Sequence, residues 1–292
     1  MKQPMGPPAC GAAGRAGADA VAPAAGKNLN EPTIGVVDRR TVASDAAQAS
    51  TKRRGRFYLG SAAVLLLVVL VGFSPTFYLR AAFGARELSW RVLVHGLILT
   101  AWFLAFALQA ALVAGRRTAL HRALGWAGAA IGLAVIISGG MATPYRMAEL
   151  AAQGRLEPLM ATAPIIVWSN TASIVAFAIL LAAAIVLRRR PETHKRLMLL
   201  ASISIIQPAF ARLFRWPVFG APGMEAVWLA VAASFVLVGV LIVYDLLSRG
   251  SIHPATVAGA AVFGGLKLGG VFLLAPSRLG PWLVRAMVAV VS

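Results

Sequence analysis

From residue 57 onward the chain alternates between long apolar stretches and short polar segments that are mostly basic. A helix of about 20 apolar residues is long enough to cross the hydrocarbon core of a bilayer. Stretches of this kind lie at about residues 57–79, 90–114, 121–141, 164–187, 194–214, 225–247 and 255–275. The pattern predicts an all-α, polytopic transmembrane helical bundle of about seven spans. Six spans are the alternative, because the last stretch is rich in glycine and contains Lys267.

Prolines and polar residues predict the details of this bundle. Pro75 and Pro208 lie inside apolar stretches and predict a kink or a break, since proline removes a helical hydrogen bond and its ring clashes with the preceding turn. Residues 143–162 are predicted to form a polar loop. Residues 282–291 are apolar but too short to span, so we expect them to lie in the membrane interface.

Two of the predicted hairpins repeat each other at an offset of 73 residues, the separation of His121 from His194. Without a gap, His121-Arg122 aligns with His194-Lys195, and a weaker third copy ends at His253. Each histidine follows an arginine by four residues; these arginines are Arg117, Arg190 and Arg249. The repeat predicts helical hairpins that superpose with His121 on His194, each histidine opening a second helix.

The first 56 residues differ in composition from the rest. They are rich in Ala, Gly and Pro, and such a segment buries too little apolar surface to offset the entropy lost on ordering. We therefore predict a disordered cytoplasmic tail over residues 1–56 and a transmembrane helical domain over residues 57–292. The single cysteine, Cys10, lies in the tail and excludes an internal disulfide.

Charge supports a membrane location and suggests an orientation. The formal net charge is +18 at pH 7, while 59% of residues are hydrophobic. In a soluble protein that charge would suggest binding to nucleic acid. Here the basic residues lie mainly between apolar stretches, where they suit lipid headgroups. The expected partner is therefore the lipid bilayer, and we expect no binding to nucleic acid. Segments on one side of the bundle hold about twice as many Lys and Arg as those on the other. This bias predicts a multi-pass inner-membrane protein with a cytoplasmic N-terminus.

Polar residues at the predicted cytoplasmic ends of the spans form an inner layer of candidate ligands: His121, His194, His253 and Asp245. Imidazole ligates both haem iron and transition metals, and a helix N-terminus favours the neutral ring that can bind them. The alternative, which the sequence alone favours, is that these histidines are interfacial anchors that bond lipid phosphate or loop carbonyls. The cofactor thus remains unknown, with haem and a transition metal as candidates.

A second group of polar residues falls near the opposite ends of the spans and comprises His95, Asn170 and Gln207. For His95 we favour a hydrogen bond between helices, with a proton or ligand relay through Asn170 as the alternative. A cytochrome with two haems needs four axial ligands in two layers. This outer layer has one histidine, and Trp168 stands at the repeat-related position, which argues against two bis-histidine haems.

Several segments together resemble a family of uncharacterised bacterial multi-pass membrane proteins. The resemblance covers about residues 57–285, and its most specific parts are HRALG and HKRLM, supported by PTFYLRAAFG, HGLILTAWFLAFALQAALV and YDLLSRGSIHPATVAG. The placement of histidines is also loosely similar to cytochrome-oxidase assembly factors and to four-helix cytochromes b. The first resemblance implies a membrane bundle and no particular activity, and the second implies haem ligation.

The sequence contains no motif of an enzyme active site. There is no Gly-rich phosphate loop, no His-Glu-x-x-His and no Gly-x-Ser-x-Gly. Three functions therefore remain open: an integral membrane protein of unknown activity, a haem- or metal-binding protein in redox chemistry or oxidase assembly, and a small-solute transporter. The hairpin repeat is the only support for the transporter.

Overall fold

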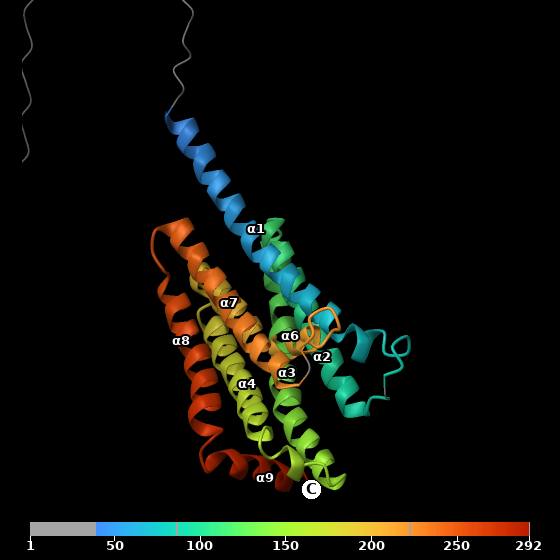
Figure 1. Ribbon diagram of the computed structural model, residues 1–292. Helices are drawn as coiled ribbons and strands as arrows, with labels where there is room; N and C mark the ends of the chain where they lie inside the picture. The colour runs from blue at the N-terminus through green and yellow to red at the C-terminus, as the bar shows by residue number, and fades with distance from the viewer. Residues whose placement is uncertain (1–38, 86, 222, 292) are drawn as a thin grey trace, which may run out of the picture. The chain divides into compact units, whose positions relative to one another are not determined.

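The computed structural model describes residues 39–85, 87–221 and 223–291, and one compact unit begins at Ser44. Within these residues the regular structure is entirely helical, which confirms the predicted all-α class (Figure 1). The α-helices are α1 (Arg39–Phe73), α2 (Trp90–Ala114), α3 (Thr118–Ala152), α4 (Ala163–Val186), α5 (Pro191–Ser204), α6 (Gln207–Phe214), α7 (Met224–Arg249), α8 (Pro254–Leu268) and α9 (Leu279–Val291). Short π-helices over Ser74–Tyr78 and Gly269–Leu274 and a 3₁₀ turn over Glu157–Leu159 complete the list.

Six helical segments of the described chain are long and apolar enough to cross a membrane, an arrangement compatible with a multi-pass membrane protein. The number is seven if the bent pair α5 and α6 is counted as one span. The glycine-rich stretch predicted at about residues 255–275 is one of these six segments, Pro254–Leu274, by its length and composition. Whether the chain has six or seven spans therefore depends on the fifth stretch, because α5 and α6 form a span only if they are counted together.

The break between α5 and α6 follows from one residue. Pro208 has no N–H to donate, and its ring clashes with the carbonyl four residues earlier, which belongs to Ser204. The helix α5 ends at Ser204, and α6 begins at Gln207 with Pro208 in its first turn, the two axes meeting at 45°. The predicted break at Pro208 is confirmed.

Two predicted boundaries are corrected by the structure. The polar loop expected at residues 143–162 starts only at Gln153, because α3 continues through Pro144 to Ala152. Strong helix formers after Pro144, with the Arg146–Glu149 ion pair one turn apart, sustain the helix past the proline. At the other end, α1 is already helical from Arg39, and residues 1–38 of the predicted tail lie outside the described residues.

The repeat is visible in the helix starts. Thr118 opens α3 and Pro191 opens α5, at the same offset as the two histidines. The backbone N–H of His121 donates to the Arg117 carbonyl at 3.0 Å, and that of His194 to the Arg190 carbonyl at 2.9 Å. The Arg-x-x-x-His spacing is thus the first hydrogen-bonded turn of each helix. Superposition of the complete hairpins stays a prediction, and α3 is 35 residues long where α5 has 14.

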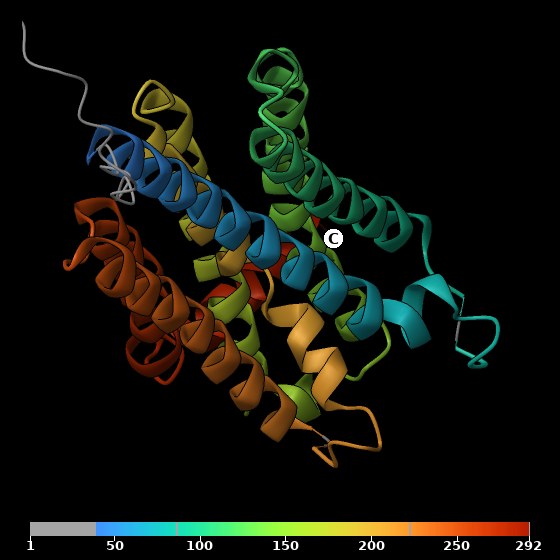
Figure 2. The ribbon, with the colours of Figure 1, turned by 90° about the horizontal axis from the view of Figure 1, so that it is seen from above.

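The core lies around α4 and α5, with α7 and α8 beside them and α9 packed against α3 and α4 (Figures 1 and 2). Leu200, Phe177 and Leu241, from α5, α4 and α7, are fully buried there. Of the five glycines of α3, two permit close packing. A Cβ on Gly132 would meet Leu181, and one on Gly139 would meet Ile174.

A buried ion pair joins three helices of this core. Arg196 of α5 donates from Nε to Asp245 Oδ1 of α7 at 3.0 Å, and both side chains are at most 1% exposed. The other Asp245 oxygen accepts from the Thr256 hydroxyl of α8 at 2.6 Å and from the backbone N–H of His253 at 3.1 Å. Arg196 also donates to Glu192 Oε2 at 2.7 Å. Each charge is therefore paired and its hydrogen-bonding capacity is used, as burial requires.

We predict that Asp245→Asn lowers the free energy of unfolding by about 3 kcal/mol, because it leaves the buried Arg196 guanidinium without its main counter-charge. Denaturation of the purified protein in mixed micelles measures the change. Glu149→Gln is the matched control, since the Arg146–Glu149 pair is about half exposed and should contribute about 0–1 kcal/mol. Equal effects of the two substitutions would contradict the prediction.

A second prediction concerns the contact of α1 with α6. A Cβ on Gly72 would collide with the backbone carbonyl of Ala209, whereas one on Gly60 of the same helix meets nothing within 4 Å. Gly72→Ala should therefore destabilise the fold by about 1–3 kcal/mol, as overpacking does. Gly60→Ala should be neutral or slightly stabilising, because alanine favours the helix. Thermal unfolding of both variants in one detergent tests the pair, and a harmless Gly72→Ala would refute the close approach.

Candidate functional site

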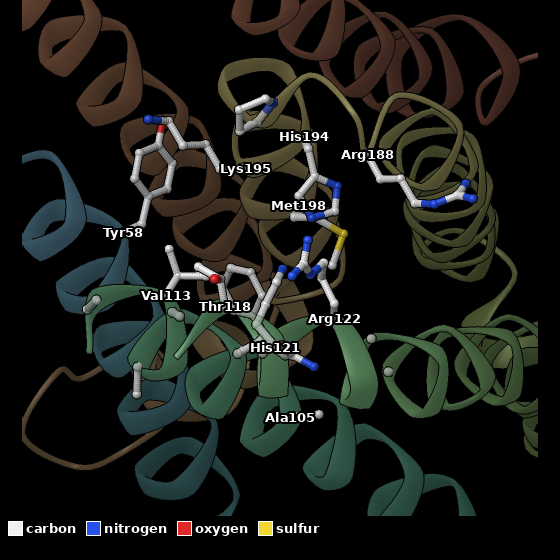
Figure 3. Close-up of a pocket in the computed structure, with 18 of the residues that line it drawn as sticks. Tyr58, Ala105, Val113, Thr118, His121, Arg122, Arg188, His194, Lys195 and Met198 are labelled. Carbon is white, nitrogen blue, oxygen red and sulfur yellow. The ribbon is translucent and has the colours of Figure 1, made fainter. Parts of the chain in front are cut away.

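A cavity of about 1650 Å³ opens between the ends of several helices, and α1 to α5 all contribute to its lining (Figure 3). Its inner wall is apolar, with Trp102 and Phe106 of α2, Leu181 and Ile185 of α4, and Met198 of α5. Binding sites for small ligands usually have volumes of about 300–1,000 Å³. The cavity is therefore large enough for a cofactor-sized or lipid-sized molecule with an apolar body.

Two of the candidate histidines meet in this cavity. His121 and His194 both line it, and the centroids of their rings are 6.4 Å apart with an interplanar angle of 74°. Figure 3 shows His194 and Met198 on α5 across from His121 and Arg122 on α3. The pair comes together because each histidine occupies the same position in the first turn of its helix, and these turns adjoin. The structure thus joins the two repeat-related residues that the sequence aligned.

A hydrogen bond fixes the tautomer of His194. Its Nδ1 lies 2.9 Å from the carbonyl oxygen of Ala184, an atom that can only accept, so Nδ1 must carry the proton when the ring is neutral. The Nε2 lone pair is then available. Metal-binding histidines in proteins almost always donate their other ring N–H in this way, often to a backbone carbonyl. The Ala184 contact therefore prepares His194 to act as a ligand.

Three buried polar atoms of residues that line the cavity have no hydrogen-bond partner: His121 Nδ1, Gln109 Oε1 and Tyr58 Oη. Buried polar atoms are satisfied in the great majority of cases, because leaving one unpaired costs about 1–3 kcal/mol. Their gathering around one cavity indicates that a bound molecule or solvent completes their bonding. The His121 ring is the most informative of the three, since it faces the prepared ring of His194.

The rim of the cavity is strongly basic. Six Lys and Arg side chains line it: Arg56, Arg116, Arg122, Arg188, Arg189 and Lys195. Glu192 is the one acid of the lining, and it is already bonded to Lys195 and Arg196 at 2.7 Å each. Two of the bases also lie over aromatic rings, Arg188 over Trp126 and Lys195 over Tyr58. The mouth is therefore suited to anionic groups attached to an apolar body.

The structure separates the other two inner candidates from the histidine pair. Asp245 is saturated by Arg196, Thr256 and the His253 backbone, and neither His253 nor Asp245 lines the cavity. His253 caps α8, its Nδ1 accepting from the backbone N–H of Ala255 at 3.0 Å. Burial, and then the charges of Arg196 and Arg249, lower the pKa of His253, which keeps the ring neutral and able to accept that bond. These residues fasten the α7–α8 connection.

The outer group also divides into separate contacts. His95 Nδ1 of α2 lies 3.1 Å from the hydroxyl of Ser138 on α3, which is the hydrogen bond between helices that the sequence favoured. Asn170 Nδ2 donates to the Thr143 hydroxyl at 3.4 Å, so no bond links His95 to Asn170. Gln207 instead belongs to a network around Lys267.

The donor set limits what the site can hold. The described residues contain no group of three or more His, Cys, Asp or Glu side chains arranged to bind a metal ion. A tetrahedral zinc site takes at least three protein ligands, which the two histidines cannot supply. Haem iron needs the protein for its axial positions only, and two facing imidazoles fit that requirement.

Sequence reasoning missed several residues of these sites. In the sequence, Arg196 is one of several bases between two apolar stretches and nothing singles it out, although Asp245 inside an apolar stretch already indicates a buried cation as its partner. Tyr58 and Gln109 carry no pattern that marks them. Their role in the cavity follows only from packing between helices.

No family model, curated protein or solved structure matches the chain.

Proposed function

We propose that the chain is a haem protein of the membrane, in which His121 and His194 provide the two axial ligands of one haem in the cavity between α1 and α5. The observation that carries the proposal is the pair of imidazoles brought together in this cavity, with ring centroids 6.4 Å apart and an interplanar angle of 74°. At this separation both residues could be ligands of one metal centre, and a haem held by them would supply one-electron chemistry.

The surroundings of the pair support the same ligand. The apolar wall formed by Trp102, Phe106 and Leu181 suits a macrocycle, and the Arg and Lys side chains of the rim suit its two carboxylates. His194 is held in the ligating tautomer by Ala184, and Nδ1 of His121 lacks any other partner. The loose similarity of the histidine placement to cytochromes b points in the same direction.

Occupation of both axial positions by histidine favours electron transfer over substrate chemistry. If both histidines held the haem, they would leave no position for oxygen or a substrate, and the chemistry that the group would supply here is one-electron transfer. The lining of the cavity holds one carboxylate, Glu192, and it is engaged in ion pairs. We therefore infer a one-electron redox role, alone or in the assembly of a larger oxidase.

The proposal extends to location and orientation. We place the chain in the inner membrane of a bacterium with a cytoplasmic N-terminus, because the most basic segments lie at the start of the first candidate span, Arg56–Tyr78, and at the starts of α3 and α5. The same segments form the rim of the cavity. In this orientation the haem lies near the cytoplasmic surface of the membrane.

Absorption spectroscopy tests the haem directly. The protein, purified from cells supplied with a haem precursor, should show a Soret band and sharp α and β bands on reduction, the signature of low-spin bis-histidine iron. His121→Ala and His194→Ala should each lose the haem or convert it to a high-spin form. His95→Ala and His253→Ala are matched controls that leave the spectrum unchanged, since neither residue lines the cavity. A colourless protein that also fails to bind added hemin would refute the proposal.

Thiol labelling tests the orientation. In a Cys10→Ser background, a cysteine at Thr193 should resist an impermeant maleimide in intact cells and react after lysis, because residues 188–196 carry the largest basic excess. A cysteine at the exposed Arg155, beyond the far end of α3, should react in intact cells. The reverse pattern would invert the topology and place the cavity on the outer surface.

A further inference from the structure

A lysine lies fully buried in the span formed by α8 and the π-helix that follows it. Lys267 is 1% exposed, and its ammonium nitrogen makes four contacts with oxygen atoms. These are the Ser169 carbonyl at 2.9 Å, the Ser169 hydroxyl at 3.1 Å, the Ser173 hydroxyl at 2.6 Å and Gln207 Oε1 at 2.6 Å. The contacts join α8 to α4 and α6.

This environment is unusual because every partner is neutral. No carboxylate of the described residues forms an ion pair with Lys267, whereas the buried Arg196 has Asp245. A charged group inside a membrane protein is costly, and such groups normally pair with an opposite charge or line a polar cavity. The ammonium has three protons, and four oxygens surround it. The stabilising elements are thus oxygen dipoles gathered around a cation.

The oxygens form a preassembled cage. Gln207 is the first residue of α6, immediately after the break caused by Pro208, and its Oε1 also accepts from the Ser169 hydroxyl at 2.9 Å. Three oxygens of the cage belong to side chains, and the fourth is the Ser169 carbonyl within α4. The residue beside the break, a serine pair one turn apart on α4 and the lysine of α8 thus meet in one set of contacts.

We propose that Ser169, Ser173 and Gln207 form a monovalent-cation site whose resident cation is the ammonium of Lys267. The cation is thus a side chain of the protein itself, and its hydrogen bonds connect α6, the second part of the broken span, to α4 and α8. The site is independent of the haem proposal, because none of its four residues lines the cavity of His121 and His194. Removal of the lysine side chain should open the cage to a free cation of similar size.

Thermal unfolding in detergent tests the site in the full-length protein. Lys267→Ala is compared with the wild type in choline chloride and in equal concentrations of sodium, potassium and methylammonium chloride. The wild-type midpoint should be the same in all four salts. The Lys267→Ala midpoint should fall in choline and rise saturably with at least one small cation, because an ion that binds only the folded state stabilises it.

Two variants serve as controls for this response. Lys267→Met keeps the volume of the side chain without its charge, so it should be destabilised and insensitive to the cation. Gln207→Leu combined with Lys267→Ala removes a cage oxygen and should abolish the response. A small-cation response that is absent in Lys267→Ala, or present equally in Lys267→Met, would overturn the proposal.

A milder pair keeps the test decisive if Lys267→Ala does not accumulate. Ser173→Ala removes one cage oxygen and should lower the wild-type midpoint. Ser234→Ala removes a buried serine that bonds the Ala230 carbonyl of its own helix, and it should change the midpoint little. Equal midpoints of the two variants would overturn the proposal. The haem spectrum should stay unchanged in all of these variants, so the two proposals fail or succeed separately.

Discussion

The buried pair of Arg196 and Asp245 holds the inner half of this bundle together. Neither charge could remain in an apolar interior alone, so the pair requires α5, α7 and the α7–α8 connection to meet at one place. Glu192, on the first turn of α5, completes the coordination of the arginine. That turn also carries His194, so the ion pair fixes the part of the chain on which the candidate site depends.

The first turns of α3 and α5 show how a sequence repeat becomes a site. Each turn begins at an arginine N-cap and places a histidine at its fourth residue. When two such turns adjoin, their imidazoles face each other and the apolar sides of α2 and α4 enclose the space behind them. The basic residues on which the proposed orientation rests also form the rim of that space. One set of residues accordingly carries both the proposed topology and the proposed ligand.

Charged side chains in the interior are stabilised in two different ways. Near the starts of the helices, charge meets opposite charge in the network of Asp245. Deeper in the bundle, the ammonium of Lys267 meets neutral oxygens of Ser169, Ser173 and Gln207. Through these contacts the lysine joins α6, the helix that follows the break, to α4. The two arrangements tie α5 to α7 and α6 to α4 and α8, although the helix is broken between α5 and α6.

The sequence by itself determined that the chain holds six or seven long apolar helices, that one of them breaks at Pro208, and that His121 aligns with His194, because hydropathy, proline geometry and helix starts are local properties. It misplaced the end of α3, since helix-forming residues continued past Pro144. The sequence pattern grouped His253 and Asp245 with His121 and His194 because all four residues are predicted to lie at the same depth in the membrane. The position of a residue along a helix does not determine the direction in which its side chain points. Only tertiary packing decided that Asp245 faces Arg196, that two histidines share a cavity, and that Lys267 turns inward to Gln207, because these contacts depend on the rotation of each helix about its axis.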